Sequence, residues 1–466
     1  MPFGPAATRS TRVGPPRRPL YWPFARLCLA NVSPLTGFLR SKGWRRSATA
    51  VWLYTSVALG LLGTVVAARE LGKHDFGLYA TVVAAAGLFE SLLDLTVEES
   101  LTKFGFRYIA AEDWGRLRRL FVIAIRFKAL GAVFALVALA AFAPIANWVF
   151  GAHGLVAPML AVAFLPLIQT QEDVAATALL LRGRYDLRGA FLAFSMALRL
   201  AGIAVGAHYG VLEAVLGMLA AQVVATATVA GAGVTAFRRF PRADARPLAE
   251  DRREIGNFVV QSSIATGVLS LRTMLAPLLL GIVAGTTAVG FFRVAQAPQS
   301  GLTAASSPVL LILLTEQTRD WELGRERTVL AGIRRYVVGA IALMTVVVPV
   351  FYWAMPDLVR LVFGRQYLDA ATAARVILFA AALQFVYGWS KSLPVSIGKP
   401  QLRIWAHGLE TLVLLPLVLV LGWKWDVTGA GVATLVSSVA FVALWTVFLA
   451  RLRGEVAARR TTATVS

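Results

Sequence analysis

Residues 71–100 read LGKHDFGLYATVVAAAGLFESLLDLTVEES, and an apolar run of 20 residues occupies positions 76–95. At 1.5 Å per residue, a helix of that length covers ~30 Å, the hydrocarbon thickness of a bilayer. The run nevertheless carries Glu90 and Asp94, and Glu98 follows at the same spacing of four. Residues four apart share one face of a helix, and a carboxylate that faces lipid is costly. The stretch therefore predicts a membrane-spanning helix whose polar face looks into protein or water.

The composition of the whole chain agrees with a membrane protein. Hydrophobic residues make up 58% of the 466 residues, charged residues only 15%, and the mean hydropathy is +0.68. A water-soluble chain of this length would need far more polar surface, so a polytopic helical membrane protein is predicted. The single cysteine, Cys28, excludes an intrachain disulfide framework.

Twelve apolar spans follow one another after residue 46, and each is interpreted as a helix. They cover residues 48–68, 76–97, 120–143, 155–181, 189–208, 212–236, 256–282, 287–314, 335–355, 371–396, 403–422 and 428–450. The predicted fold class is therefore an all-α polytopic membrane protein with about twelve transmembrane helices.

Positive charge is distributed unevenly over the two sides of these spans. Residues 1–46 hold nine Lys or Arg and no acid, and this tail together with alternate loops and the C-terminus holds 35, whereas the opposite connections hold five. Lys and Arg gather on the cytoplasmic side of membrane proteins, so both termini are predicted to be cytoplasmic. The same asymmetry accounts for the net charge of +21 without nucleic acid. The Pro-rich tail is predicted to be disordered or interfacial, next to the anionic inner leaflet.

An internal repeat divides the chain into halves. The sequence GLY at 77–79 returns as GFF at 290–292, and VFG at 149–151 returns at 362–364, each 213 positions later. Because each half holds six spans, an even number, the halves have the same orientation in the membrane. The repeat predicts two parallel-related six-helix bundles with a central cleft, a plan that suits alternating access.

The predicted organisation has five parts. They are a basic tail over 1–46, an N-terminal six-helix bundle over 47–237, a cytoplasmic linker over 238–254, a C-terminal six-helix bundle over 255–452 and a cytoplasmic tail over 453–466.

Four stretches carry a family likeness. They are ARELGKHDFGLYATV at 68–82, GFFRVAQAPQSGLTAASSPVLLILLTEQTR at 290–319, LVFGRQYLDAATAARVILFAAAL at 361–383 and GKPQLRIWAHGLETLVLLPLVLVLGWKWDVTGAGVATLVS at 398–437. In order and over most of 48–452, the chain resembles the polysaccharide transporters, or O-antigen-type flippases, of the multidrug/oligosaccharidyl-lipid/polysaccharide exporter (MOP) superfamily.

The resemblance implies a flippase that moves a polyprenyl-diphosphate-linked oligosaccharide outward across the bacterial inner membrane, for exopolysaccharide or O-antigen biosynthesis. A polysaccharide polymerase and glycosyltransferases would then be neighbours. The chain departs from the pattern at 276–281, where the run APLLLG lacks the acidic residue expected shortly before it. The resemblance therefore implies no ion-coupling role for that helix.

The sequence shows no enzyme chemistry. It has no phosphate-binding G-x-x-x-x-G-K-[ST] loop, no H-E-x-x-H, no C-x-x-C and no G-x-S-x-G, and its four histidines are scattered. We therefore expect a transporter that is not an enzyme and that uses no cofactor and no metal.

Six basic residues lie inside the predicted spans. They are Arg126, Lys128, Arg199, Arg272, Arg293 and Arg375. Arg272 lies near the middle of the seventh span, too deep to reach the interface, and an arginine fork suits a diphosphate. The functional hypothesis is that Arg272, with Arg199 from the other half, holds the lipid diphosphate, and that Arg293 and Arg375 are further candidates. The alternative for each is a structural arginine, paired with a carboxylate or reaching the interface.

Four acidic residues are candidates for ion coupling. Glu90 and Asp94 lie on the second span, and Glu172 and Asp173 lie together in the fourth. A desolvated carboxylate in a membrane titrates near neutral pH and can bind a proton or sodium ion. The alternative is an interhelical ion pair that fixes the bundle. For Arg126 and Lys128, we expect pairing with Asp94 or Glu98 on the neighbouring helix.

Other functions remain open at this stage. A cation-coupled drug or metabolite antiporter of the same superfamily predicts an anionic cavity. A flippase for the peptidoglycan lipid precursor needs the same grip on a diphosphate. A non-transport membrane scaffold predicts no continuous polar cavity.

Overall fold

The computed structural model describes residues 42–93, 97–249, 251–397, 399 and 401–463. The chain divides into two units, Met1–Arg45 and Arg46–Ser466, and the fold below is that of the second unit. The basic tail predicted over 1–46 lies outside the described residues as far as residue 41. In the described part, the chain is helical with short connections and contains no strand.

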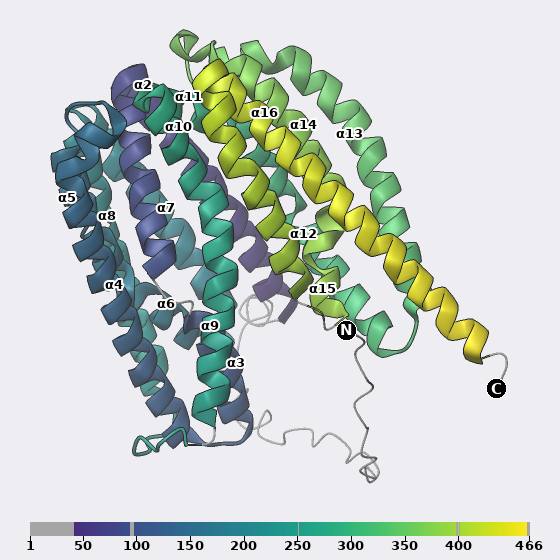
Figure 1. The fold of residues 1–466 in the computed structure, drawn as a ribbon. Helices are drawn as coiled ribbons and strands as arrows, with labels where there is room; N and C mark the ends of the chain where they lie inside the picture. Colours follow the sequence, from purple (N-terminus) through teal and green to yellow (C-terminus); the bar gives the residue numbers. More distant parts are fainter. Residues whose placement is uncertain (1–41, 94–96, 250, 398, 400, 464–466) are drawn as a thin grey trace. The chain divides into compact units, whose positions relative to one another are not determined.

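Seven helices form the N-terminal half. They are α2 (Lys42–Leu93), α3 (Val97–Ala110), α4 (Trp114–Phe150), α5 (Val156–Val162), α6 (Leu165–Leu181), α7 (Tyr185–Ala207) and α8 (Val211–Arg238). α2 contains two spans, because Gly72, with φ 74° and ψ 175°, leaves helical geometry and the chain turns back there (Figure 1). α5 and α6 together make the fourth span, so this half has six.

The C-terminal half follows the same plan with more interruptions. Its elements are α9 (Asp251–Ser270), the π-helical turn η2 (Leu271–Leu275), α10 (Ala276–Ala284), α11 (Thr286–Ala295), α12 (Ala297–Glu322), α13 (Glu326–Val362), the 3-10 turn η3 (Arg365–Tyr367), α14 (Ala370–Val386), the 3-10 turn η4 (Gly388–Lys391), α15 (Leu393–Ser396) and α16 (Gln401–Ala463). α16 contains the last two spans, because Trp425 and Asp426 break its helical geometry.

The number of passes agrees with the prediction. Seven helical stretches of the described part are by themselves long and apolar enough to cross a membrane. The remaining passes come from the reversals inside α2 and α16 and from three spans that are interrupted, α5–α6, α11–α12 and α14–α15. The all-α polytopic fold with about twelve membrane helices is thereby confirmed.

Backbone geometry repeats between the halves. Four positive-φ residues in connections of the N-terminal half have a positive-φ counterpart 212 to 216 positions later. The pairs are Gly72 and Gly285, Glu112 and Gly324, Gly151 and Gly364, and Gly210 and Asp426. Because positive φ is uncommon outside glycine, matching positions indicate the same sequence of turns in both halves. The two bundles are therefore parallel-related, as the sequence repeat predicted.

Two helices are longer than their predicted spans. α4 and α13 each contain 37 residues, whereas hydropathy placed spans over 120–143 and 335–355 only. The turns added at the N-terminal end of each helix carry basic residues, and a hydropathy window does not register such polar extensions. Because α13 continues to Val362, only residues 363–369 connect it to α14.

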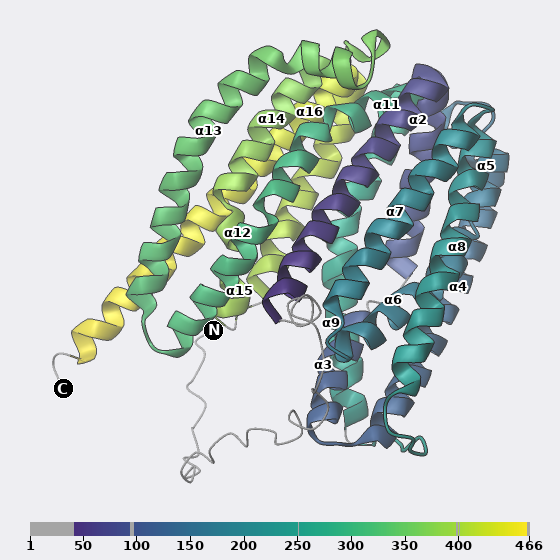
Figure 2. The same ribbon diagram turned by 180° about the vertical axis from the view of Figure 1, so that it is seen from behind.

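The two halves lie side by side in the second unit. In Figures 1 and 2, helices of the N-terminal half (purple to blue) lie on one side and those of the C-terminal half (green to yellow) on the other, with the first part of α2 and α9–α10 between them. α7 packs along α8 and α8 along α6, while α14 and α10 pack along α16. α7 and α8 cross so closely that a Cβ on Gly202 would lie 2.2 Å from the carbonyl oxygen of Gly217.

Contacts close the ends of the two halves that are predicted to face outward. Arg69 in α2 donates through Nε to the Val362 carbonyl oxygen at 2.8 Å and through Nη2 to the Leu361 carbonyl oxygen. The Tyr367 hydroxyl donates to the Ala68 carbonyl oxygen at 2.8 Å, and its side chain is fully buried. Side chains of one half thus satisfy backbone oxygens of the other at this end.

A glycine pair lets the halves meet just below these contacts. Gly77 and Gly290, equivalent positions of the repeat, touch across the boundary: a Cβ on Gly290 would lie 3.1 Å from the Cα of Gly77. A Cβ on Gly77 would lie 2.4 Å from the Thr286 carbonyl oxygen. Equivalent residues meet in this way only near the axis that relates the two repeats.

At the opposite ends, α9 is attached to the N-terminal half through α3. Arg107 in α3 forms two hydrogen bonds with the Glu254 carboxylate of α9, at 2.8 and 2.9 Å. The Tyr108 hydroxyl donates to Asp251 Oδ2 at 2.8 Å. Burial and this hydrogen bond raise the pKa of Tyr108 above its ordinary value, so the phenol keeps the proton that it donates.

Candidate functional site

A cavity of about 430 Å³ lies between the halves, and we call it the central cavity. Its walls come from α2, α6, α7 and α8 on one side and from η2, α10 and α11 on the other. Its charged and amide side chains are Glu90, Gln169, Arg199, Arg293 and Gln296. The cleft predicted between the bundles is therefore present, and it is polar along part of its wall.

Arg293 reaches this cavity from the C-terminal half. It lies on α11, between Phe292 and Val294, which are each only 1% exposed. Arg293 itself is exposed, and it lines the central cavity as well as a second cavity described below. Its exposed surface therefore faces the interior spaces of the protein. No carboxylate of the described residues lies within 4.0 Å of its guanidinium.

Arg199 faces the same cavity from the N-terminal half. It is half-buried on α7, and its Nη2 lies 3.5 Å from the Met218 sulfur of α8. Like Arg293, it forms no ion pair within the described ranges. Both arginines line this cavity together with the buried Tyr79. Two predicted substrate-binding residues are thus brought together.

The polar face of the second span is only partly described. Glu90 lines the central cavity, as its helical position predicted. Asp94, the next member of the predicted stripe, lies outside the described residues. Gln169 in α6 joins Glu90 in the cavity wall, and its Oε1 is shielded from solvent without a hydrogen-bond donor in the described part of the chain.

The other predicted coupling residues form structural contacts in the N-terminal half. Lys128, 3% exposed, lies 2.5 Å from an Asp173 oxygen and 3.5 Å from a Glu98 oxygen. Glu172 accepts a hydrogen bond from Gln222. Glu172 and Asp173 do not line the central cavity. Of the two predicted partners of Lys128, Glu98 is within ion-pair distance and Asp94 lies outside the described residues, while Asp173 is a contact that was not predicted. Arg126 is exposed and forms no ion pair with a carboxylate of the described residues.

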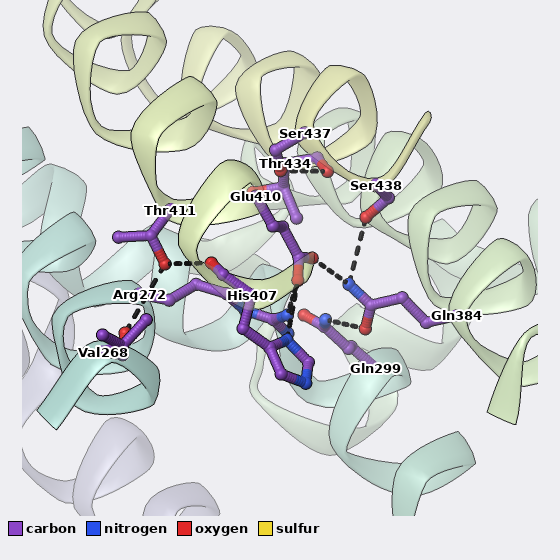
Figure 3. A network of polar contacts seen from close by, with 10 residues as sticks. All are labelled: Val268, Arg272, Gln299, Gln384, His407, Glu410, Thr411, Thr434, Ser437 and Ser438. Carbon is purple, nitrogen blue, oxygen red and sulfur yellow. Dashed lines mark hydrogen bonds and ion pairs between the residues drawn. The ribbon is translucent and has the colours of Figure 1, made fainter. Parts of the chain in front are cut away.

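Arg272 is held by an internal anion (Figure 3). Its Nη1 forms an ion pair with Glu410 Oε2 from α16, whose side chain is 1% exposed. His407 Nδ1, one turn earlier in α16, lies 3.2 Å from the same oxygen. Arg272 is not among the residues that line the central cavity, although Thr273 and Met274 are. The alternative considered for Arg272, pairing with a buried carboxylate, is the arrangement found.

Amides and hydroxyls complete the surroundings of this carboxylate. Gln384 in α14 donates to Glu410 Oε1 at 3.1 Å and to Ser438 Oγ at 3.0 Å. Gln299 in α12 donates to Gln384 Oε1 at 2.9 Å. Figure 3 shows these side chains converging from different helices on one point. Sequence reasoning missed Glu410, although an acid within the apolar span 403–422 was a visible signal.

Arg375 is engaged by a neighbouring helix. Its Nε donates to the Tyr352 carbonyl oxygen of α13 at 2.9 Å, and its guanidinium lies 4.8 Å from the centre of the Tyr352 ring. It lines neither the central cavity nor the second cavity. Of the four predicted substrate contacts, Arg199 and Arg293 share a cavity, whereas Arg272 and Arg375 contact protein groups elsewhere. Among the described residues, no three His, Cys, Asp or Glu side chains gather as a metal site.

The fold and the central cavity define a polytopic membrane protein built from two related six-helix bundles. A family model for polysaccharide biosynthesis proteins matches residues 46–313, and the chain belongs to that family. Over 121 residues, the chain is 33% identical to the inner membrane protein YghQ of Escherichia coli strain K12. The aligned region covers 24% of this chain and 32% of YghQ. The match thus spans about a third of the length of that curated relative.

Two solved structures share the fold. An inward-facing multidrug resistance MATE family transporter of the MOP superfamily has a TM-score of 0.66 at 14% identity, covering 88% of this chain and 98% of that one. The lipid II flippase MurJ, in an inward closed conformation, has a TM-score of 0.66 at 12% identity, covering 85% and 86%. At these identities the likeness concerns the fold. The chain therefore shares the fold of these two proteins and belongs to the family of polysaccharide biosynthesis proteins.

Proposed function

We propose that this chain is a flippase that carries a polyprenyl-diphosphate-linked oligosaccharide across the bacterial inner membrane for surface polysaccharide biosynthesis. The observation that carries the proposal is the pair Arg199 and Arg293, which face one cavity from opposite halves without a carboxylate within ion-pair distance in the described part of the chain. Guanidinium groups present planar forks of donors that bind diphosphate oxygens strongly. A diphosphate between the two would connect the halves.

The charge of the cavity favours an anionic substrate. Its described lining residues include two arginines but only one carboxylate, that of Glu90. A cation antiporter would instead gain from a net negative lining. The amide groups suit the sugar: Gln169 Oε1 lacks a donor, and a sugar hydroxyl would supply one.

Alternating access fits the arrangement of the two halves. The contacts of Arg69, Tyr367 and Gly77 close the ends predicted to face outward, so the structure corresponds to a state that is shut on that side. Rocking one bundle against the other would break these contacts and open the cavity outward. Because the substrate crosses without any change of its covalent bonds, the protein needs no catalytic residue.

The cellular setting belongs to the same proposal. The excess of Lys and Arg on alternate connections supports a cytoplasmic position for both termini. The lipid part of the substrate is supplied by the bilayer, and a polysaccharide polymerase and glycosyltransferases would act on either side of the transport step.

A reconstituted transport assay tests the proposal. The full-length protein is placed in liposomes with a fluorescent polyprenyl-diphosphate disaccharide, and arrival in the opposite leaflet is measured with a membrane-impermeant quencher. We expect wild-type protein to accelerate transfer, and Arg199→Gln and Arg293→Gln each to slow it at least about tenfold, the loss of one charge-assisted contact of ~1.5–3 kcal/mol. Arg293→Lys should restore part of the rate.

Arg126→Gln is the matched control, because Arg126 lies in a membrane span but is exposed on α4 and does not line the central cavity. It should transport at the wild-type rate. Failure of the wild-type protein to move the lipid would refute the proposed function. Normal transport by both glutamine variants would refute the anion-binding role of the cavity.

A further inference from the structure

A second and larger space adjoins the central cavity. This apolar cavity, about 670 Å³ in volume, is bounded by α2, α11, α12, α13 and α14. Its wall is mostly aliphatic and aromatic, with contributions from residues such as Met344, Val347, Phe351 and Leu378. Among the described lining residues, Arg293 is the one charged side chain. Its volume lies in the range of pockets that hold organic ligands.

The two cavities meet at a defined boundary. They share four lining residues, Leu61 and Thr64 from α2, Arg293 from α11 and Gln296 from the end of that helix. On one side of Arg293, the wall carries a carboxylate, an amide and a second arginine; on the other, it is apolar. A molecule bound across this boundary would have a polar part, then an anionic group beside Arg293, then a hydrocarbon part.

We infer that the apolar cavity holds the first isoprene units of the lipid substrate while its diphosphate lies at Arg293 and its sugars lie in the central cavity. This inference rests on the proposed function and adds a binding site for the hydrocarbon chain. Burial of the chain in an aliphatic pocket is favourable in proportion to the apolar area removed from water. The site would thereby distinguish the lipid-linked sugar from a water-soluble sugar diphosphate with the same polar group.

The chain offers a clean way to fill this cavity. Gly301 of α12 lines it, and a Cβ at that position would meet no atom within 4 Å. A phenylalanine side chain at position 301 would therefore extend into the space that the isoprenoid occupies. Gly339 of α13 is the matched control, because a Cβ there also meets open space but the residue lines neither cavity.

The experiment compares two ligands with identical disaccharide-diphosphate groups, one on a long isoprenoid chain and one, the short-chain ligand, with a methyl group in place of the isoprenoid. Affinities are measured on full-length protein in nanodiscs. We expect Gly301→Phe to weaken the long-chain ligand at least about tenfold and to leave the short-chain ligand within about twofold. Gly339→Phe should bind both like wild type. Ala305→Phe, which enters the same cavity from the next turn, should reproduce the result, and thermal melting checks that each variant is folded.

The outcomes separate this inference from the function beneath it. If wild-type protein binds both ligands and Gly301→Phe and Ala305→Phe bind them equally well, the chain site is wrong while the flippase proposal stands. If wild-type protein shows no preference for the longer chain, the chain site is likewise wrong. If wild-type protein binds neither ligand, the proposed function fails, and this inference fails with it.

Discussion

Glu410 is a carboxylate inside a helix that crosses the membrane, with 1% of its side chain exposed. A buried ion costs several kcal/mol in solvation, so it needs a partner and filled hydrogen bonds. Arg272 supplies the charge, and His407 and Gln384 supply contacts to the two oxygens. Arg272 therefore has a structural role whether or not it also contacts the substrate. Loss of function in an Arg272 variant alone would be ambiguous.

Stability measurements on the pair resolve that ambiguity. Arg272→Met and Glu410→Leu should each lower the unfolding free energy by about 3–5 kcal/mol, because each leaves one buried charge without its partner. The double variant Arg272→Met with Glu410→Leu should recover most of the loss, since it removes both charges and keeps the volume. Denaturant unfolding in detergent micelles gives the values, with Arg126→Ala as the exposed control.

The same double variant tests the predicted substrate contact of Arg272. If the folded double variant transports normally, Arg272 serves the fold and the substrate-contact prediction is wrong. If it is stable but inactive, Arg272 contributes to transport beyond its pairing with Glu410. Loss of stability in the double variant equal to the sum of the single losses would show that the two residues are not energetically coupled.

The seventh span is the element that connects the two halves. Its first part, α9, packs against α3 of the N-terminal half, and its last part, α10, packs along α16 of the C-terminal half. Between them, the π-helical turn Leu271–Leu275 interrupts the regular hydrogen-bond ladder and contains Arg272. Such turns are frequent at functional sites and are places where a helix can bend. A movement of one half would therefore be transmitted through this span.

A charge swap tests the attachment of α9 to α3. Arg107→Glu or Glu254→Arg alone places two like charges where a two-bonded ion pair lies, and each should slow lipid transfer several-fold. The combination Arg107→Glu with Glu254→Arg should return transport close to the wild-type rate, because the pair re-forms with reversed polarity. Both side chains are well exposed, so the melting temperature should change little.

Raised salt offers an independent check on this pair. High ionic strength should narrow the difference between the single variants and wild type, since exposed charges are screened. Single variants with wild-type transport rates would show that the α3–α9 junction does not take part in the conformational cycle.

Hydropathy and the repeat predicted the plan of the molecule because both are properties of local sequence. Every span needs about 20 apolar residues wherever it packs, and positive-φ glycines such as Gly151 and Gly364 mark equivalent turns. Side-chain pairing, in contrast, is not a property of local sequence. Arg272 and Glu410 are 138 positions apart, and Arg69 meets Val362 over 293 positions. Such partners depend on how the helices are placed in space, which no single stretch encodes.

The sequence could narrow the site to charged residues inside spans but could not sort them. Hydropathy places Arg199, Arg293 and Arg375 inside spans but does not show which of them face a cavity. Packing separates them: the first two face the central cavity, and Arg375 is bonded to the backbone of α13. The identity of the sugar is even harder to predict from local sequence, because its recognition is spread over hydrogen-bonding groups of several helices.

Closure at the predicted outer end is the feature of the whole molecule on which alternating access depends. Arg69 and Val362 belong to different halves and are joined by a hydrogen bond of 2.8 Å in this state. In a Cys28→Ser background, which removes the single native cysteine, we expect Arg69→Cys with Val362→Cys to be cross-linked by a short bifunctional methanethiosulfonate. The cross-link should stop lipid transfer in liposomes by holding the halves together, and reduction of the linker should restore it. Each single-cysteine variant, treated in the same way, should keep its untreated rate, which separates tethering from simple modification or from loss of the arginine. Continued transfer by the fully cross-linked protein would mean that the outer ends need not separate, and the rocking mechanism would have to be abandoned even if the lipid substrate is correct.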